Sequence, residues 1–192
     1  MKFTAEELLI VNDTDFLLTK AKVTEKLNRL LENTREELLS FIQISDFNFP
    51  KELNLDYGKI SKGENYNQLP FMILDFPSHF TKENIFAYRT MFWWGNFFST
   101  TLHLQGNLLD IHRKNIYKNA LKLFSKEIYI CIGKTPWQYH YQEDNYILLT
   151  EENYHLIKEV PFLKLSSKIH VNNYNSLPNF SLSYFKLFLS IL

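Results

Sequence analysis

The stretch Ile85–Leu104, IFAYRTMFWWGNFFSTTLHL, decides the fold that the sequence predicts. Two runs rich in aromatic residues flank Gly95-Asn96, a dipeptide that suits a two-residue hairpin turn of type II′ or I′. Because side chains alternate along a strand, both faces of this hairpin carry apolar residues. We therefore expect a central hairpin that is covered on both sides, or on one side by another subunit.

A two-residue turn also fixes which residues of the hairpin lie opposite each other. It pairs Trp94 with Phe97, and further along the strands it pairs Tyr88 with His103. In this register Tyr88, Trp94 and His103 share one face of the hairpin, and Arg89 lies on the opposite face.

Helical patterns lie on both sides of the hairpin in the sequence. Thr4 and Glu7 indicate a capping box that opens a short helix to about Val11. The cap-type residues 12–15 then begin a long helix, whose apolar residues keep helical spacing to about Gln43. Later helices are expected at about 107–125, at 150–160 and at 179–192. The last of these is apolar nearly all round, so we expect it in the core or in a dimer contact.

Short strands complete the expected sheet, at 57–60, at 69–76 up to Pro77, at 127–133, at 137–141 and at 146–150. The rest of 44–67 resembles a long loop, and 163–171 is compatible with either a helix or a strand. The chain is therefore expected to form one α+β domain, residues 1–192. It would have a mostly antiparallel sheet of five to seven strands, packed by the long N-terminal helix and the later helices.

Composition excludes several classes of protein. The 192 residues include 21 basic and 21 acidic side chains, so the basic excess typical of nucleic-acid binding is missing. Cys131 is the one cysteine, which excludes an intramolecular disulfide and a cysteine-based zinc site. The start of the chain lacks a signal-peptide pattern and no long uncharged apolar run occurs, so we expect a cytoplasmic protein with no membrane span. Aromatic residues reach 16%, which predicts an aromatic-walled core or pocket.

One part of the chain resembles a known group of sequences. The likeness covers about residues 58–106 and rests on Gly63–Tyr66, on Leu69–Asp75 and on Tyr88–Ser99, which contains the unusual string Phe-Trp-Trp-Gly-Asn. These segments resemble an uncharacterised family of small cytoplasmic proteins from flavobacteria and their relatives. The resemblance implies a bacterial source, and it implies no activity.

Several short motifs carry little weight as sites. Gly133-Lys134-Thr135 resembles the end of a phosphate-binding loop, but Ile128 stands where the first glycine is needed and an apparent strand follows. Asp110 and His112, with His103, could supply metal ligands, but their spacing is unspecific. Ser99 and His103 are too far apart along one strand to act as a nucleophile and its base. A basic stripe on the third long helix, at 114, 118, 122 and 126, is typical of a solvated face.

The best candidate site centres on Arg89. An arginine inside an apolar strand needs a partner, either Asp75 or Glu83 of this chain or the carboxylate or phosphate of a bound anion. Tyr88 and His103, opposite each other in the expected register, could relay a proton. Trp94, together with the aromatic residues 93, 137, 139 and 141, could line a pocket for a planar or acyl ligand.

Two functions follow as hypotheses. The first is a non-catalytic binding or protein-interaction module, which takes a protein partner or self-associates and uses no cofactor or metal. The second is a small enzyme, or a binding protein for an anionic small molecule, that uses Arg89 with His103 or Tyr88. The second hypothesis needs a partly solvated pocket. It would be excluded by an Arg89 fully paired inside the protein and a His103 sealed from solvent.

Overall fold

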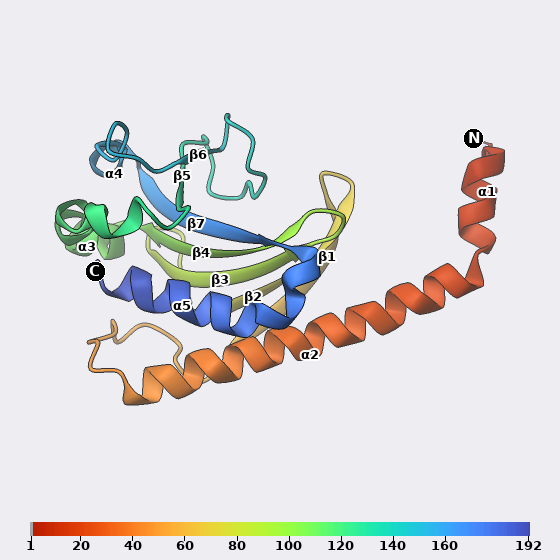
Figure 1. The fold of residues 1–192 in the computed structure, drawn as a ribbon, viewed down its shortest axis with the longest axis horizontal. Helices are drawn as coiled ribbons and strands as arrows, with labels where there is room; N and C mark the ends of the chain where they lie inside the picture. Colours follow the sequence, from red (N-terminus) through yellow and green to blue (C-terminus); the bar gives the residue numbers. More distant parts are fainter. Residues whose placement is uncertain (1) are drawn as a thin grey trace.

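The computed structural model describes residues 2–192, and its centre is one seven-stranded sheet in the order β1-β2-β3-β4-β7-β5-β6 (Figure 1). All of the paired strands run antiparallel. The strands are β1 (Lys59–Tyr66), β2 (Leu69–Phe80), β3 (Ile85–Trp93), β4 (Phe97–Gln105), β5 (Tyr129–Cys131), β6 (Tyr146–Leu148) and β7 (Phe162–His170). The helices are α1 (Ala5–Asn12), α2 (Thr14–Ile44), α3 (Asn107–Lys118), α4 (Leu156–Glu159) and α5 (Leu177–Leu189), with 3-10 turns η1 (Ala120–Leu123) and η2 (Val171–Ser176).

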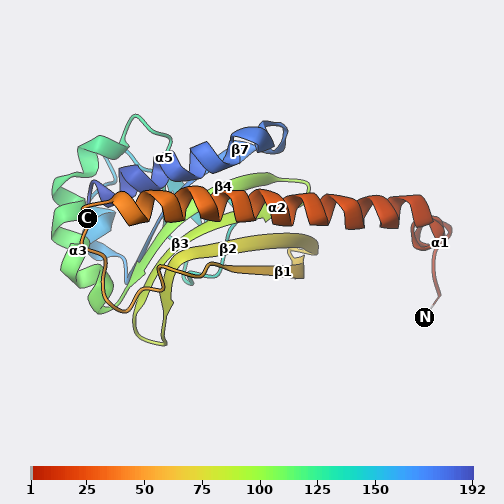
Figure 2. The same ribbon diagram turned by 90° about the horizontal axis from the view of Figure 1, so that it is seen from below.

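The α+β class, the antiparallel sheet and the long N-terminal helix are confirmed. Helices α2 and α5 lie side by side against one face of the sheet (Figure 2). The main core fills the space between these two helices and the sheet. It includes Leu31, Leu38, Phe98, Leu102 and Phe185, all almost completely buried. Within residues 2–192, no helix combines the length and the apolar character that crossing a bilayer needs.

The helix boundaries follow the capping signals in the sequence. Thr4 accepts from the amide of Glu7, whose carboxylate accepts from the amide of Thr4, so the expected capping box is present. Asp13 caps α2 by accepting from the amide of Phe16 at 2.8 Å. Pro178 lies in the first turn of α5, as expected for a residue that has no amide hydrogen to donate.

The expected register of the central hairpin is wrong by one residue. Trp93, not Trp94, pairs with Phe97, so the turn holds three residues, Trp94, Gly95 and Asn96. Gly95 takes a φ of 72°, which glycine adopts without steric cost. A slip of one residue moves every side chain of one strand to the other face. Each residue of β3 therefore faces a different residue of β4 from the one expected.

The structure corrects other strand boundaries. β2 continues past Pro77 to Phe80, with an irregularity between Asp75 and Ser78 that accommodates the proline. β1 takes up much of the expected loop, and 163–171 lies largely within β7, which is central in the sheet. Most of the helix expected at 150–160 is a series of turns that ends in the four-residue α4.

The expected strand at 137–141 is not formed. Its amides are satisfied by a side chain instead, because the Tyr66 hydroxyl accepts from the amides of Tyr139 and His140 at 2.7 and 3.0 Å. The loop 132–145 consequently lies over the face of the sheet opposite α2 and α5 (Figure 1). This loop sets the environment of Arg89.

Candidate functional site

Arg89 and Asp75 lie directly opposite each other on neighbouring strands β3 and β2. Nε and Nη2 of Arg89 donate to the two carboxylate oxygens of Asp75 at 2.7 and 2.9 Å, and Nη1 donates to the Tyr139 hydroxyl at 2.6 Å. Burial opposes the charge of Arg89, but Asp75 outweighs it, so the pKa of Arg89 is raised. The pairing of Arg89 with Asp75, one of the alternatives drawn from the sequence, is present, and each guanidinium nitrogen has an internal acceptor.

Lys164 of β7 lies on the same face of the sheet and is only 2% exposed. Its ammonium donates to the carbonyl oxygens of Pro136 and Gln138, both at 2.7 Å, and so fixes the loop that covers it. In the described part of the chain, no carboxylate lies within 4.0 Å of this ammonium. Burial, with the positive charge of Arg89 as a second cause, lowers the pKa of Lys164 to about 7.

His103 lies between these two cations. It pairs with Ala87 of β3 and with Lys164 of β7 across the sheet. His103 is 5% exposed, and its Nε2 has no hydrogen-bond partner among the described residues. Burial, followed by the charges of Lys164 and Arg89, lowers the pKa of His103 to about 3, so this imidazole is neutral at physiological pH.

Asp75, Arg89, His103, Tyr139 and Lys164 are called the polar cluster below. A small cavity of about 10 Å³ lies between Arg89, His103 and Lys164. A cavity of this size holds roughly one water molecule. Arg89 is paired internally and His103 is only 5% exposed, so in the described part of the chain neither side chain opens onto a large solvated pocket.

Tyr88 does not belong to the polar cluster, and its expected proximity to His103 is wrong. In the observed register Tyr88 pairs with Leu102 and faces α5. Its hydroxyl donates to the carbonyl oxygen of Ser181 at 2.5 Å and accepts from Thr100. Burial raises the pKa of Tyr88 far above its ordinary value, so its hydroxyl keeps its proton at neutral pH, and its hydrogen bonds join α5 to the sheet.

Trp94 also lies away from the polar cluster. It sits in the turn of the hairpin, where its ring contacts Phe92 at 5.5 Å between centroids on the face that α2 covers. Of the aromatic residues expected around a pocket, Tyr139 caps the polar cluster and Trp93 packs with Tyr66. Tyr66 also packs against Tyr139 with 5.0 Å between the ring centroids, so these three rings contact one another, whereas Trp137 is 48% exposed.

The remaining motifs have structural explanations. Cys131 is buried, its thiol donates to Asn145, and burial raises its pKa, which makes it unreactive. Among residues 2–192, no group of three His, Cys, Asp or Glu side chains is placed to hold a metal ion, and Asp110 and His112 are not part of such a group. Lys122 of the basic stripe donates to the carbonyl oxygen of Ser190 and fixes the end of α5. Gly133-Lys134-Thr135 leads into the loop over the sheet and not into a helix.

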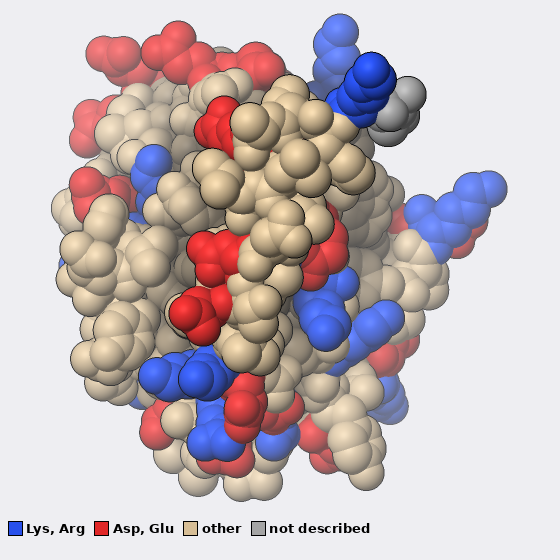
Figure 3. Space-filling view, turned by 90° about the vertical axis from the view of Figure 1, so that its right-hand side faces the viewer, with Lys and Arg blue, Asp and Glu red and all other residues tan. Residues whose placement is uncertain are grey.

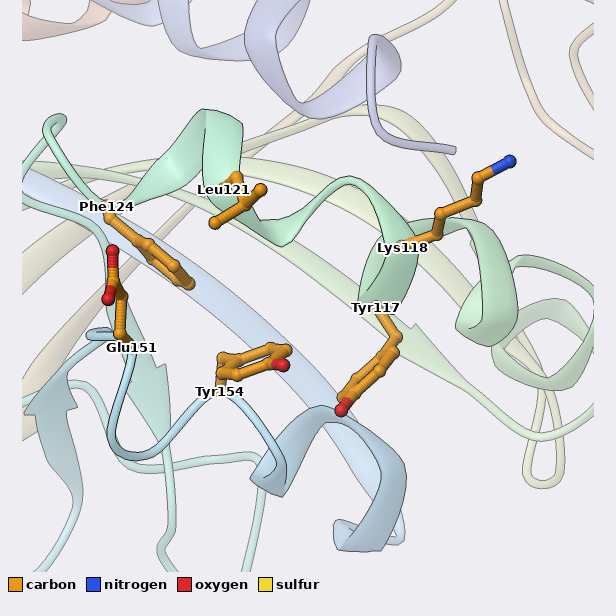
Figure 4. Close-up of a pocket in the computed structure, with 6 residues that line it drawn as sticks. All are labelled: Tyr117, Lys118, Leu121, Phe124, Glu151 and Tyr154. Atoms are coloured by element: carbon orange, nitrogen blue, oxygen red, sulfur yellow. The ribbon is translucent and has the colours of Figure 1, made fainter.

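An open hollow of about 420 Å³ lies beside α3 (Figure 4). Tyr117 and Tyr154 stack in it with their centroids 4.9 Å apart, and the Lys158 ammonium lies 3.5 Å from the centroid of Tyr117. Lys118 points away from the other labelled side chains (Figure 4). The stacked rings hold α3 against the segment before α4, and no convergent polar groups suggest a bound ligand.

The most unusual surface of the molecule was not singled out in the sequence. Residues 2–19, called the N-terminal arm below, are exposed throughout, and none of α1 is buried. The arm extends beyond the sheet as α1 and the first turns of α2 (Figures 1 and 2). It carries eight exposed large apolar residues, which are Phe3, Leu8, Leu9, Ile10, Val11, Phe16, Leu17 and Leu18.

A signal for this arm was present in the sequence. The runs Leu8–Val11 and Phe16–Leu18 place apolar residues on every side of their helices, whereas a helix that lies on a core has one apolar stripe. The arm is joined to the body at Lys20, which forms an ion pair with Glu64 of β1 at 2.9 Å.

Comparison of the chain with models of protein families, with curated proteins and with solved structures found no match.

Proposed function

We propose that this protein is a non-catalytic interaction module that docks onto a protein surface through its N-terminal arm. The observation that carries the proposal is the exposure of all eight large apolar residues of the arm. Soluble monomers rarely expose a contiguous apolar patch of this kind, and those that do so usually bind a partner there.

The distribution of apolar residues around α1 favours a partner that surrounds this helix on more than one side. Leu8, Leu9, Ile10 and Val11 are consecutive, so together they cover the whole circumference of α1. Leu9 alone is 75% exposed. A helix that is apolar on all sides is stabilised only when it is buried on more than one side, which a groove or a pair of helices achieves.

A protein partner fits the charges of the arm better than a lipid surface does. Interfacial helices that bind membranes are usually rich in lysine and arginine on the polar face, because lipid headgroups are often anionic. The charged residues of the arm are instead mainly acidic, and include Glu6, Glu7, Asp13 and Asp15. Figure 3, which views the molecule from the side of the arm, shows an uncharged projecting surface bordered by charged groups.

The polar cluster supports this proposal because its cationic groups are already bound to acceptors within the chain. Arg89 and Lys164 are committed to internal acceptors, and the cavity between them has room for about one water molecule. The groups that sequence reasoning assigned to an anionic ligand are thereby occupied in stabilising the fold, and the arm is the surface left without a structural role.

A photoreactive amino acid placed at position 9 tests the proposal in cells that express the chain. Leu121 supplies a matched control, because it is 72% exposed on the opposite part of the molecule. We expect irradiation to join position 9, but not position 121, to a protein surface, seen as a discrete band of higher mass. Equal labelling at the two positions, or no adduct at position 9, would contradict the proposal.

A further inference from the structure

A groove lies where the body begins, immediately beside the arm. It has a volume of about 500 Å³ and runs between α2 and the segment η2, which precedes α5. Leu30, Phe92, Phe98, Val171 and Tyr174 give it apolar walls. Lys26 and Arg29 of α2 border it with positive charge.

The face of α2 that lines the groove continues into the arm. Val23, Lys26 and Leu30 line the groove at spacings of three and four residues, and the same spacing leads back to Thr19 and Phe16 in the arm. The groove and part of the arm therefore lie on one continuous face of one helix. A second helix that ran antiparallel along this face would contact both.

The charges on the two surfaces are complementary. Asp13 and Asp15 stand at the start of α2, and Glu6 and Glu7 lie in the first turn of α1. Lys26 and Arg29 of α2 line the groove, Lys22 lies one turn before Lys26 on the same helix, and Arg29 forms an ion pair with Glu25. An acidic arm that lies on the basic border of the groove gains favourable charge contacts. Two acidic arms in contact with each other would repel.

We infer that the partner of the arm is a second copy of this chain, and that each copy places its arm in the groove of the other. The inference rests on the proposed function, and it names the partner. The two α2 helices would run antiparallel about a two-fold axis that passes near Thr19. Asp15 of one copy then lies near Lys22 and Lys26 of the other, and Leu8 lies near Leu30.

Symmetry explains why the arm and the groove are adjacent. In a two-fold dimer the same patch serves on both subunits, so a surface must be complementary to itself. The arm and the groove lie on either side of Thr19 on α2. A two-fold rotation about an axis near Thr19 therefore places the arm of each copy on the groove of the other. In Figure 1, α1 turns from α2 to the side on which the sheet lies.

Light scattering coupled to size exclusion tests the inference on the full chain over a wide range of concentration. We expect twice the chain mass of 23.0 kDa for the wild type. Lys26→Glu and Asp15→Lys should each weaken the dimer about tenfold, and the double variant should restore it, because the reversed charges attract again. Circular dichroism would confirm that each variant is folded.

A cysteine at position 19 gives a second test, which depends on the position of the proposed two-fold axis. Cys131 is buried, so Thr19→Cys introduces a single exposed thiol, which meets its own counterpart only at a two-fold axis. We expect mild oxidation to give a covalent dimer of Thr19→Cys and none of Glu36→Cys, an exposed control on the same helix.

The two proposals fail separately. A wild-type chain that stays at 23.0 kDa at every concentration would overturn the dimer, even if position 9 cross-links to a different protein and so supports an interacting arm. A dimer that survives Lys26→Glu and Asp15→Lys unchanged, with no covalent dimer of Thr19→Cys, would overturn the exchange of arms.

Discussion

The polar cluster and the N-terminal arm reverse the usual distribution of residue types. The cluster buries a carboxylate, a guanidinium, an imidazole and an ammonium, and the arm exposes eight large apolar side chains. In the cluster almost every charged group has a partner within the chain, through Asp75, Tyr139 and the carbonyls of the covering loop. In the arm the apolar side chains have no partner within the body, since none of α1 is buried.

The difference shows where to look for function. Titratable residues attract attention in a sequence, yet here Asp75, Arg89 and Lys164 have hydrogen-bond partners within the chain, on a covered face of the sheet. Apolar residues attract little attention because most of them belong to a core. Where they are exposed on a helix that extends from the body, as in the arm, they are the basis of the proposed contact with a partner.

Breaking the polar cluster should have the largest effect on stability. Asp75→Ala leaves the guanidinium of Arg89 buried without its carboxylate, and such a loss costs about 3–5 kcal/mol in the free energy of unfolding. Urea denaturation of the purified variant measures this cost.

A second substitution controls for the loss of packing. Adding Arg89→Met to Asp75→Ala removes the unpaired charge, so the double variant should be more stable than Asp75→Ala alone. If the double variant were less stable by the sum of the two single effects, the ion pair would not explain the cost. Neither variant should alter the mass of the assembly, because the pair lies far from the arm.

Lys164 predicts a pH dependence of stability. Its pKa is about 7 in the folded chain and 10.5 when unperturbed, so between these values the unfolded chain binds the proton that the folded chain has lost. The free energy of unfolding should therefore rise with pH from about 7 towards 10.5. The expected rise is on the order of 3 kcal/mol, less than the full shift converts to, because the carbonyls of Pro136 and Gln138 favour the ammonium.

Lys164→Met removes the titrating group and keeps most of its length. Its stability should change little over the same pH range, and the difference from the wild type should be largest near and below pH 7, where the buried ammonium of the wild type destabilises the fold. Parallel slopes for the two proteins from pH 7 to 10 would assign the effect to other groups.

Local sequence patterns predicted the helices and strands better than they predicted which residues of different strands lie next to each other. The capping box at Thr4, the helix after Asp13 and the hairpin could be predicted because each depends on residues close in sequence. The hairpin register was missed because Trp94-Gly95-Asn96 accommodates a three-residue turn as readily as Gly95-Asn96 accommodates two.

The error in register carried over to the candidate site. The pairing of Asp75 with Arg89 was anticipated, but Tyr88 was placed beside His103, when the observed strands bring Arg89 and His103 to the same face. Lys164 was missed because its segment was compatible with a helix or a strand, and only the sheet order places it next to His103. Contacts between distant strands are not encoded in the pattern of any one of them.

The arm should show the smallest effect on the stability of one chain and the clearest effect on assembly. Leu9→Ser and Phe16→Ser replace residues that are 75% and 52% exposed, so each should change the free energy of unfolding of the isolated chain by no more than about 0.5 kcal/mol. Phe16→Ser should nevertheless abolish the cross-link from position 9, and Leu9→Ser should weaken the dimer measured by light scattering. Ile111→Ser, equally exposed at 68% on α3, should leave stability and cross-linking unchanged. A cost of 2 kcal/mol or more at Leu9, measured where the chain is monomeric, would mean that the arm folds back onto its own body, and the contrast with the polar cluster would be lost.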